Sequence, residues 1–331
     1  MAKLRVGVLR GGPSSEHEVS LRTGENVLNS LPKKKYEGID VVLRKDGRLL
    51  ANKFPIKIQE LNDWADVVFN ALHGQFGEDG GVQQILDKIK IPYTGSGCMA
   101  SALGMNKVLS REFFKEAGLK IPRAIVVKSK ENPEETAMKI FQKMHPFWVV
   151  KPASSGSSIG VSIVKNFHDL APAIKRAFDF SDETIVEEYI KGREATCGIL
   201  ENFRGEEHYA LPVIEIVPPS HRSFFDYECK YDGSTKEICP SHFDIPTKRE
   251  IENVARMAHR ALGCEAYSRT DMIVSNNPAK GGASGVYLLE VNTLPGLTSE
   301  SLVPKSASAV GLDFPQLLEH IIELALNRKR F

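Results

Sequence analysis

The fold is decided by a stretch near the C-terminal end of the chain, Val286-Tyr287-Leu288-Leu289-Glu290-Val291-Asn292-Thr293-Leu294-Pro295-Gly296. Its apolar, β-branched and aromatic residues predict a buried strand, and Pro295-Gly296 predicts the end of that strand. Because side chains alternate between the two faces of a strand, Glu290 and Asn292 point to the same side. A carboxylate and an amide presented together offer the oxygen ligands that a hard cation requires.

A second strand is predicted upstream, over residues 267–274, and its Arg269 and Asp271 also share a face. If the two strands pair as a hairpin across residues 275–285, the oxygen ligands of both strands converge beside the guanidinium of Arg269. The alternative is a pair of edge strands with solvated charges. The sequence thus predicts either a metal site on a hairpin or an ordinary charged edge.

The composition is that of an ordinary globular protein, with 331 residues, 42% hydrophobic and 26% charged. This length predicts two or three domains with ample cores. A net charge of +1 gives no reason to expect a nucleic-acid or membrane partner. The apolar runs are shorter than a membrane span, and residues 1–5 lead into a predicted strand rather than a signal peptide. We therefore expect a cytoplasmic protein.

The cysteines are odd in number and contain no CxxC pair. This pattern predicts reduced thiols and argues against a structural zinc site. The cysteines are Cys98, Cys197, Cys229, Cys239 and Cys264.

The N-terminal third reads as an α/β unit. A strand over residues 4–9 enters a glycine-rich turn, and a helix follows through Leu28 with Ser14 or Ser15 as its cap. A strand, a glycine turn and a helix N-terminus form a natural anion site, but the turn is not GxGxxG and no dinucleotide fingerprint is present. Glu16 in this turn is either functional or simply an acid favoured by the helix dipole.

A further buried strand is predicted over residues 67–72, and it ends at His73 in a run of glycines. Ligands bind at strand ends in open α/β sheets, so His73 is a candidate binding residue. The alternative is a capped turn with an incidental histidine.

The middle of the chain combines a lysine with a Ser/Gly loop. Residues 101–117 are predicted to be one helix that contains Lys107, and the strand over residues 147–152 carries Lys151 before its final proline. The loop over residues 153–161 could cover phosphates, although it is not a P-loop and such loops are often only connections.

The last part begins with a strand, a hinge and another strand over residues 184–194. Residues 220–242 form a long irregular segment whose aromatics argue for a functional loop rather than disorder. Amphipathic helices are predicted over residues 248–262 and 315–327.

Seven motifs occur in order along the chain, and together they are far more specific than any one alone. They are Gly11–Ser20 (GGPSSEHEVS), His73–Gly80 (HGxxGEDG), Ile91–Ser96 (IPYTGS), Lys151–Val161 (KPxxxGSSxGV), Asp226–Tyr231 (DYxxKY), Arg269–Asp271 (RxD) and Glu290–Thr298 (EVNTLPGLT). On these motifs the chain closely resembles the D-alanine–D-alanine ligase family of the ATP-grasp superfamily, across nearly its whole length.

This resemblance implies an α/β fold of three domains: an N-terminal open-sheet substrate domain (1–96), a central ATP-grasp lid domain (97–187) and a C-terminal catalytic domain (188–331). It implies ATP clamped between the last two, two Mg²⁺ ions or Mn²⁺, and D-alanine as substrate. The product would be D-alanyl-D-alanine for peptidoglycan synthesis and cell shape, made by a cytoplasmic homodimer.

The resemblance also assigns roles to individual residues. Those for catalysis are Glu16, Ser157, Tyr231, Arg269, Gly296 and Ser301, and those for substrate binding are His73, Ser301 and Leu302. The ATP-binding residues are Lys107, Lys151, Ser158, Glu187, Glu188, Ile190, Glu194 and Lys230, and the metal ligands are Asp271, Glu290 and Asn292.

The chain departs from the family pattern at three positions. Asn106 replaces a common aspartate, Ser155 replaces a frequent glutamate in the lid loop, and Glu300 stands where a histidine is common. None of these is a proposed ligand, so we expect them to affect lid kinetics and substrate affinity rather than the reaction.

Three alternatives remain at this point. One is a D-alanine–D-lactate or D-alanine–D-serine ligase on the same scaffold. Another is an ATP-grasp carboxylase, which is disfavoured because no biotin- or bicarbonate-specific segment stands out. The third is a non-catalytic nucleotide-binding regulator, but each metal ligand and phosphate lysine that the family requires is present.

Overall fold

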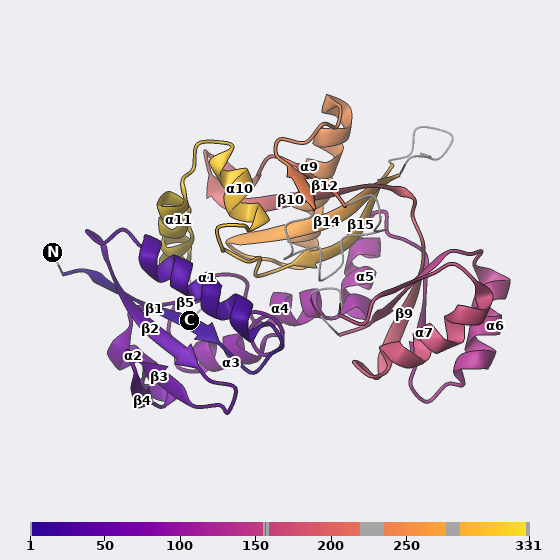
Figure 1. The fold of residues 1–331 in the computed structure, drawn as a ribbon. Helices are drawn as coiled ribbons and strands as arrows, with labels where there is room; N and C mark the ends of the chain where they lie inside the picture. Colours follow the sequence, from indigo (N-terminus) through magenta and orange to yellow (C-terminus); the bar gives the residue numbers. More distant parts are fainter. Residues whose placement is uncertain (1, 155, 157–158, 219–234, 276–284, 329–331) are drawn as a thin grey trace.

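The computed structural model describes residues 2–154, 156, 159–218, 235–275 and 285–328. Its described strands form three sheets, which follow one another along the chain and lie side by side (Figure 1). Within the described ranges, no helix is long and apolar enough to cross a membrane.

The N-terminal sheet has the strand order β4-β3-β2-β1-β5. Strands β1, β2 and β5 are parallel, and β3 and β4 extend the sheet as an antiparallel meander. Parallel strands are covered on both faces, which agrees with the continuous apolar runs of β1 and β5. The elements are β1 (Leu4–Gly11), α1 (His17–Ser30), β2 (Tyr36–Leu43), β3 (Leu49–Ala51), β4 (Phe54–Ile56), a 3₁₀ turn (Ile58–Glu60), α2 (Leu61–Trp64), β5 (Val67–Asn70) and α3 (Gly81–Lys88).

The central sheet is antiparallel, in the order β6-β9-β7-β8. Two helices pack on it and share its core, in which Trp148 is fully buried. Its elements are β6 (Ala124–Lys128), α6 (Pro133–Lys143), β7 (Trp148–Pro152), β8 (Ser162–Val164), a 3₁₀ turn (Phe167–Asp169), α7 (Leu170–Ala177) and β9 (Glu183–Glu188).

The C-terminal sheet is antiparallel, in the order β13-β12-β10-β14-β15, with β11 paired to β10. Helix α9 packs against β10, β14 and β15, α4 contacts β15, and α10 contacts β10. The strands of this sheet are β10 (Gly192–Phe203), β11 (Glu206–Ala210), β12 (Ile214–Val217), β13 (Lys236–Ile238), β14 (Tyr267–Ser275) and β15 (Val286–Asn292). The other described helices are α4 (Cys98–Met105), α5 (Lys107–Glu116), α9 (Ile245–Ala261), α10 (Leu302–Ser308) and α11 (Phe314–Asn327).

The predicted hairpin is confirmed, because β14 and β15 pair antiparallel. Asp271 lies opposite Glu290 and Arg269 lies opposite Asn292, so the four side chains belong to two cross-strand pairs. The register shifts just after Asp271, at a β-bulge. Bulges are common beside active sites, where they redirect a side chain.

The prediction of a single helix over residues 101–117 is wrong. Asn106 is extended, with φ −93° and ψ 102°, and it separates α4 from α5. Its side chain accepts hydrogen bonds from the backbone N–H groups of Val108 and Leu109. An asparagine that satisfies these two donors is a helix N-cap, so a new helix begins at Lys107.

The prediction that Ser14 or Ser15 caps the first helix is also wrong. Glu16 occupies the N-cap position of α1, without a side-chain capping bond. The hydroxyl of Ser14 instead accepts from the Glu16 N–H and donates to the His73 carbonyl oxygen, 2.6 Å away. This serine therefore joins the turn after β1 to the loop after β5.

Candidate active site

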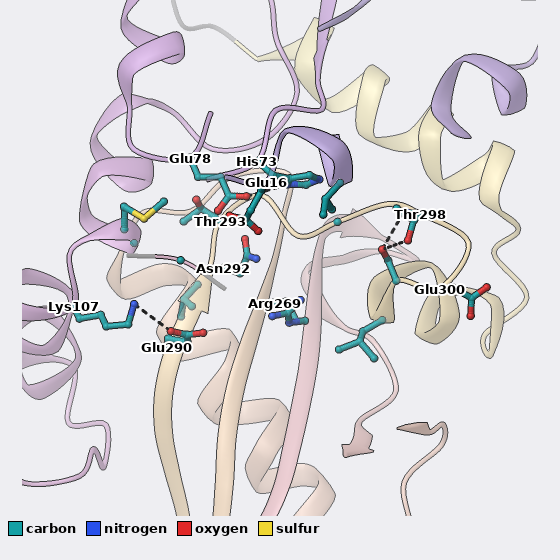
Figure 2. Close-up of a pocket in the computed structure, with 18 of the residues that line it drawn as sticks. Glu16, His73, Glu78, Lys107, Arg269, Glu290, Asn292, Thr293, Thr298 and Glu300 are labelled. Atoms are coloured by element: carbon teal, nitrogen blue, oxygen red, sulfur yellow. Dashed lines mark hydrogen bonds and ion pairs between the residues drawn. The ribbon is translucent and has the colours of Figure 1, made fainter. Parts of the chain in front are cut away.

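Two cavities meet at the β14–β15 hairpin. The first, of about 1,100 Å³, lies between the N-terminal and C-terminal sheets, and the second, of about 1,170 Å³, between the central and C-terminal sheets; both volumes include space open to solvent. Lys107, Glu290 and Leu302 line both cavities. Lys107 Nζ is 3.6 Å from Glu290 Oε2, and the two side chains face each other in Figure 2.

The charges of the hairpin interact directly. Arg269 donates to both oxygens of Asp271, at 2.9 Å and 2.8 Å, and the Thr196 hydroxyl donates to Asp271 Oδ1 at 2.7 Å. Burial alone lowers the pKa of Arg269, but the charges of Asp271, Glu290 and Glu78 raise it overall. The guanidinium is therefore a permanent cation on the wall of the first cavity.

The hairpin offers an oxygen ligand set for a hard cation. Carboxylates come from Asp271 and Glu290, and the amide of Asn292 stands beside them with its Oδ1 accepting from the Leu294 N–H at 2.9 Å. Two carboxylates and an amide next to a nucleotide-sized cavity suit Mg²⁺, which prefers few protein ligands together with phosphate oxygens.

The deep end of the first cavity holds three titratable side chains, from the N-cap of α1 and the loop after β5. Glu16 and His73 are buried, at 8% and 5% exposure. His73 Nδ1 lies 3.0 Å from Glu78 Oε1, and its Nε2 lies 3.0 Å from the Thr23 hydroxyl. Burial is the main cause of the raised pKa of Glu78, and the charge of Glu16 adds to it.

A glycine is needed at position 74 because the backbone there passes close to the carboxylate of Glu16. Gly74 has φ +69°, and a Cβ there would lie 2.7 Å from Glu16 Oε2. Any larger residue would therefore be strained and would also displace the carboxylate.

The other end of the first cavity is built by the loop after β15. The Ser301 hydroxyl accepts from the Thr298 N–H at 2.9 Å and contacts the Thr298 hydroxyl at the same distance. Gly296 lies between this serine and His73, since a Cβ there would be 3.1 Å from Ser301 Oγ and 3.9 Å from His73 Nε2. Leu302 and Glu300 also line this cavity, and Figure 2 shows Glu300 beside Thr298 at this end.

The second cavity is lined partly by apolar side chains from both sheets, with charged groups at one side. Lys151 Nζ lies 2.8 Å from Glu187 Oε2, while Arg111 Nη1 donates to Glu187 Oε1 at 2.6 Å. Glu187 is only 3% exposed, so it holds Lys151 in place as well as lining the cavity. Glu188, Ile190 and Glu194 line the same cavity, whose apolar walls and few charged groups suit a purine base and its ribose.

Most residues expected at the site are brought together by the structure. Those in the two cavities are Glu16, His73, Lys107, Lys151, Glu187, Glu188, Ile190, Glu194, Arg269, Asp271, Glu290, Asn292, Gly296, Ser301 and Leu302. Ser157, Ser158, Lys230 and Tyr231 lie outside the described residues.

Three contributors were missed by sequence reasoning. Glu78 belongs to the HGxxGEDG motif and could have been found there. Arg111 stands four residues after Lys107 on α5, so helical spacing places it on the same side. Thr196 carries no sequence signal, because only the pairing of β10 with β14 brings it opposite Asp271.

The fold and the two joined cavities define the class: an ATP-grasp enzyme, in which a nucleotide is held between a central and a C-terminal sheet beside a second substrate site. Family models agree with this class. The model described as D-ala D-ala ligase C-terminus matches residues 113–323, and the one described as D-ala D-ala ligase N-terminus matches residues 5–63 and 50–96.

Similar proteins narrow the class further. The chain is 41% identical to a D-alanine–D-alanine ligase of Syntrophobacter fumaroxidans, covering 98% of both chains. It is 42% identical to one of Geobacter sulfurreducens, covering 96% of this chain and 93% of the relative. The chain belongs to the D-alanine–D-alanine ligase family, and it is an ATP-dependent ligase.

Solved structures show the same architecture. A VanG D-Ala:D-Ser ligase from Enterococcus faecalis has a TM-score of 0.85 at 30% identity, covering 98% of this chain and all of the other. A D-alanine–D-alanine ligase from Bacillus anthracis complexed with ATP has a TM-score of 0.79 at 33% identity, covering 98% of this chain and 97% of that one.

Proposed function

We propose that this enzyme joins two D-alanine molecules through a D-alanyl phosphate, with release of ADP and phosphate, to supply D-alanyl-D-alanine for peptidoglycan. One observation carries the proposal: the second cavity, which we assign to the nucleotide, and the first cavity, which we assign to the amino acids, meet at Lys107 and Glu290. A phosphoryl group at the end of one cavity would therefore lie next to a carboxylate in the other.

The chemistry needs this adjacency. A carboxylate is a poor acylating agent because its leaving group would be oxide, whereas an acyl phosphate releases phosphate. Phosphoryl transfer depends mainly on positioning and charge neutralisation. Lys107 and Lys151, together with Lys230, would bind the phosphates, while Ser158, Glu187, Glu188, Ile190 and Glu194 would line the nucleotide site.

We assign the metal ligands to Asp271, Glu290 and Asn292, whose oxygen set fits two Mg²⁺ ions or Mn²⁺. Bound there, such ions would neutralise the negative charge of the ATP phosphates. Arg269 already pairs with Asp271, so it stays close to the site of phosphoryl transfer and cannot lose its proton at neutral pH.

The first D-alanine would bind at the deep end of the first cavity. Glu16 would hold its ammonium, and Ser157 and Tyr231 would extend that contact. His73 would border the same substrate. The acceptor would bind at the other end, with its carboxylate on Ser301 and the backbone of Leu302. Arg269 and the Gly296 N–H would stabilise the oxyanion as the acceptor amine attacks, a contribution of about 3–4 kcal/mol per donor in comparable sites.

We further propose that residues 1–96, 97–187 and 188–331 are the three domains, that the enzyme works as a homodimer, and that it resides in the cytoplasm, where ATP is available. The four cysteines within the described ranges carry free thiols, in keeping with a reducing compartment.

The decisive experiment measures phosphate release from ATP with D-alanine, D-serine and D-lactate as acceptors, with Mg²⁺ present, and identifies the products by mass spectrometry. We expect D-alanyl-D-alanine as the main product and strong stimulation by D-alanine. If D-serine or D-lactate is incorporated in preference, the acceptor assignment is wrong. If D-alanine stimulates no phosphate release, the proposed reaction itself is wrong.

A further inference from the structure

Two histidines and a glutamate come together outside both cavities. Glu201 on β10 lies directly opposite His208 on β11, and His259 of α9 packs over this pair. One ring nitrogen of each histidine and one carboxylate oxygen of Glu201 lie within 4.8 Å of one another. The side chains of all three are at most 15% exposed, and that of His259 is fully buried. The spacing is close enough for one ion to contact all three groups.

The ring of the buried His259 is oriented by a hydrogen bond to Ser268. His259 Nδ1 lies 2.8 Å from the hydroxyl of Ser268, which is itself fully buried. This leaves His259 Nε2 directed at Glu201 Oε1, at a distance of 3.4 Å. Histidines that bind metals are usually fixed in this way, with the second ring nitrogen bonded to another group.

Glu201 is anchored through its other oxygen. Oε2 accepts from the Ala266 N–H at 2.8 Å and pairs with Arg328. These two contacts hold Oε2, so Oε1 is the oxygen that faces the histidines.

His208 completes the group from the surface side. Its Nδ1 lies 3.1 Å from Arg260 Nε and 3.7 Å from Glu207 Oε2, and both partners are more than half exposed. Its ring meets that of His259 edge-on, with centroids 5.2 Å apart.

The charge around the cluster also favours a cation. Carboxylates outnumber guanidiniums among the side chains linked to it by ion pairs. Within the described part of the chain, the acids are Glu201, Glu207 and Glu265, and the bases are Arg260 and Arg328.

We propose that Glu201, His208 and His259 form a binding site for a zinc-class divalent cation. Two imidazoles and one carboxylate are an established zinc ligand set, with water completing the tetrahedron. Imidazole nitrogens suit Zn²⁺ and Co²⁺ rather than Mg²⁺, so this site is chemically distinct from the oxygen ligands of the β14–β15 hairpin. On binding, His208 would carry its proton on Nδ1, and the exposed Arg260 would swing away so that Glu207 accepts from this N–H.

Such an ion would have a structural role, because it would link the β10–β11 hairpin to α9. The anchors of the cluster reach further, because Arg328 also pairs with Glu265 and donates to the Gly95 carbonyl, while the Glu265 N–H donates to Ser96. The site therefore sits where the segment leaving the N-terminal sheet meets the C-terminal sheet, and an ion there would stabilise that junction.

The test is zinc binding by the full-length protein after dialysis against a chelator. Zn²⁺ is titrated calorimetrically in excess Mg²⁺, which occupies oxygen-only sites, and Co²⁺ is used in parallel because its visible spectrum reports tetrahedral nitrogen ligation. We expect one Zn²⁺ per chain, a tetrahedral Co²⁺ spectrum and a higher Tm with Zn²⁺. His208→Gln should weaken Zn²⁺ binding by about 100-fold or more.

Two further variants decide the interpretation. His168→Gln removes an exposed imidazole from the central domain and should bind Zn²⁺ as the wild type does. His259→Gln should lose binding, and if this buried substitution prevents folding, His208→Gln alone decides. The proposal is overturned if the wild type binds no Zn²⁺ in excess Mg²⁺, or if His208→Gln binds it with unchanged stoichiometry and affinity.

Discussion

The two cavities share Lys107 and Glu290 but hold their acids in opposite ways. In the nucleotide cavity, Glu187 is paired with two cations, Arg111 at 2.6 Å and Lys151 at 2.8 Å. In the amino-acid cavity, Glu78 lies near a second acid, Glu16, and the two repel, which helps to raise the pKa of Glu78.

This difference indicates that the charges of the two cavities are arranged differently before a ligand binds. The nucleotide side is neutralised within the protein, so its lysine is already in place before ATP arrives. The amino-acid side concentrates negative charge at its deep end, so the ammonium of a substrate completes the electrostatics. The nucleotide cavity therefore gains stability from its charges, whereas the amino-acid cavity exchanges stability for affinity.

Glu290 belongs to both cavities, and its replacement should have the largest effect. Glu290→Gln keeps the size of the side chain but removes the charge that would hold cations against the phosphates. We expect kcat to fall by about 10³-fold with little change in Tm. Phosphate release measured across a Mg²⁺ titration checks this, with Glu183→Gln, on an exposed pair with Lys128, as the control. Turnover near wild type with an unchanged Mg²⁺ dependence would refute the metal assignment.

The ion pairs of Glu187 can be tested by removing one of its two cations. Arg111→Met removes a buried guanidinium and leaves Glu187 with one partner, so the free energy of unfolding should fall by about 3 kcal/mol and KM for ATP should rise. Arg123→Met is the matched control, because Arg123 pairs with Glu188 in a geometry that leaves its side chain 69% exposed. That change should cost less than about 1 kcal/mol. If both variants lose the same free energy of unfolding, the buried ion pairs of Glu187 stabilise the protein no more than an exposed pair does.

The raised pKa of Glu78 in the amino-acid cavity should make the stability of the protein depend on pH. A carboxyl whose pKa is raised by folding binds its proton more tightly in the native state, so stability falls as pH rises through the window above its ordinary pKa of 4.5. Glu78→Gln has no such charge to bury. Its stability at neutral pH should therefore equal or exceed that of the wild type, while KM for D-alanine rises.

Urea unfolding at about pH 4.5 and about pH 7.5 measures this difference. The gain from Glu78→Gln should be larger at the higher pH. Glu112→Gln, on the surface of α5, should leave both the pH dependence and KM unchanged. If Glu78→Gln loses as much stability at neutral pH as at acid pH, Glu78 is a structural partner of His73 rather than a strained acid.

Periodicity and turn residues were enough to predict the local fold around the site. Alternation along residues 267–274 and 286–292 placed Arg269, Asp271, Glu290 and Asn292 on the correct hairpin, because a two-residue period leaves little freedom of register. The role of each residue came from the ordered motifs and not from periodicity, since any charged hairpin edge would give the same pattern.

Long-range pairings were not predictable in this way. Arg111 and Glu187 are far apart in sequence, and Thr196 reaches Asp271 only through the β10–β14 register. The same holds for Glu201, His208 and His259, which have no ligand-type spacing along the chain. The break at Asn106 was missed because an asparagine between two apolar helical segments reads equally well as an exposed position within one helix.

The smallest expected effect concerns that break. Asn106 caps α5 by accepting from Val108 and Leu109 at 3.0 Å and 3.1 Å, and α5 begins with Lys107, which the two cavities share. Asn106→Ala should cost about 1 kcal/mol, because two N–H groups lose their acceptor. Asn106→Asp keeps the acceptor and adds a charge that the helix dipole favours by about 0.3–1 kcal/mol, so it should match or slightly exceed the wild type. Thermal unfolding of the three proteins gives the ranking, and KM for ATP shows whether the cap also positions Lys107. If the alanine variant is as stable as the wild type, Asn106 is not the cap that starts this helix, and the family's common aspartate at this position serves another purpose.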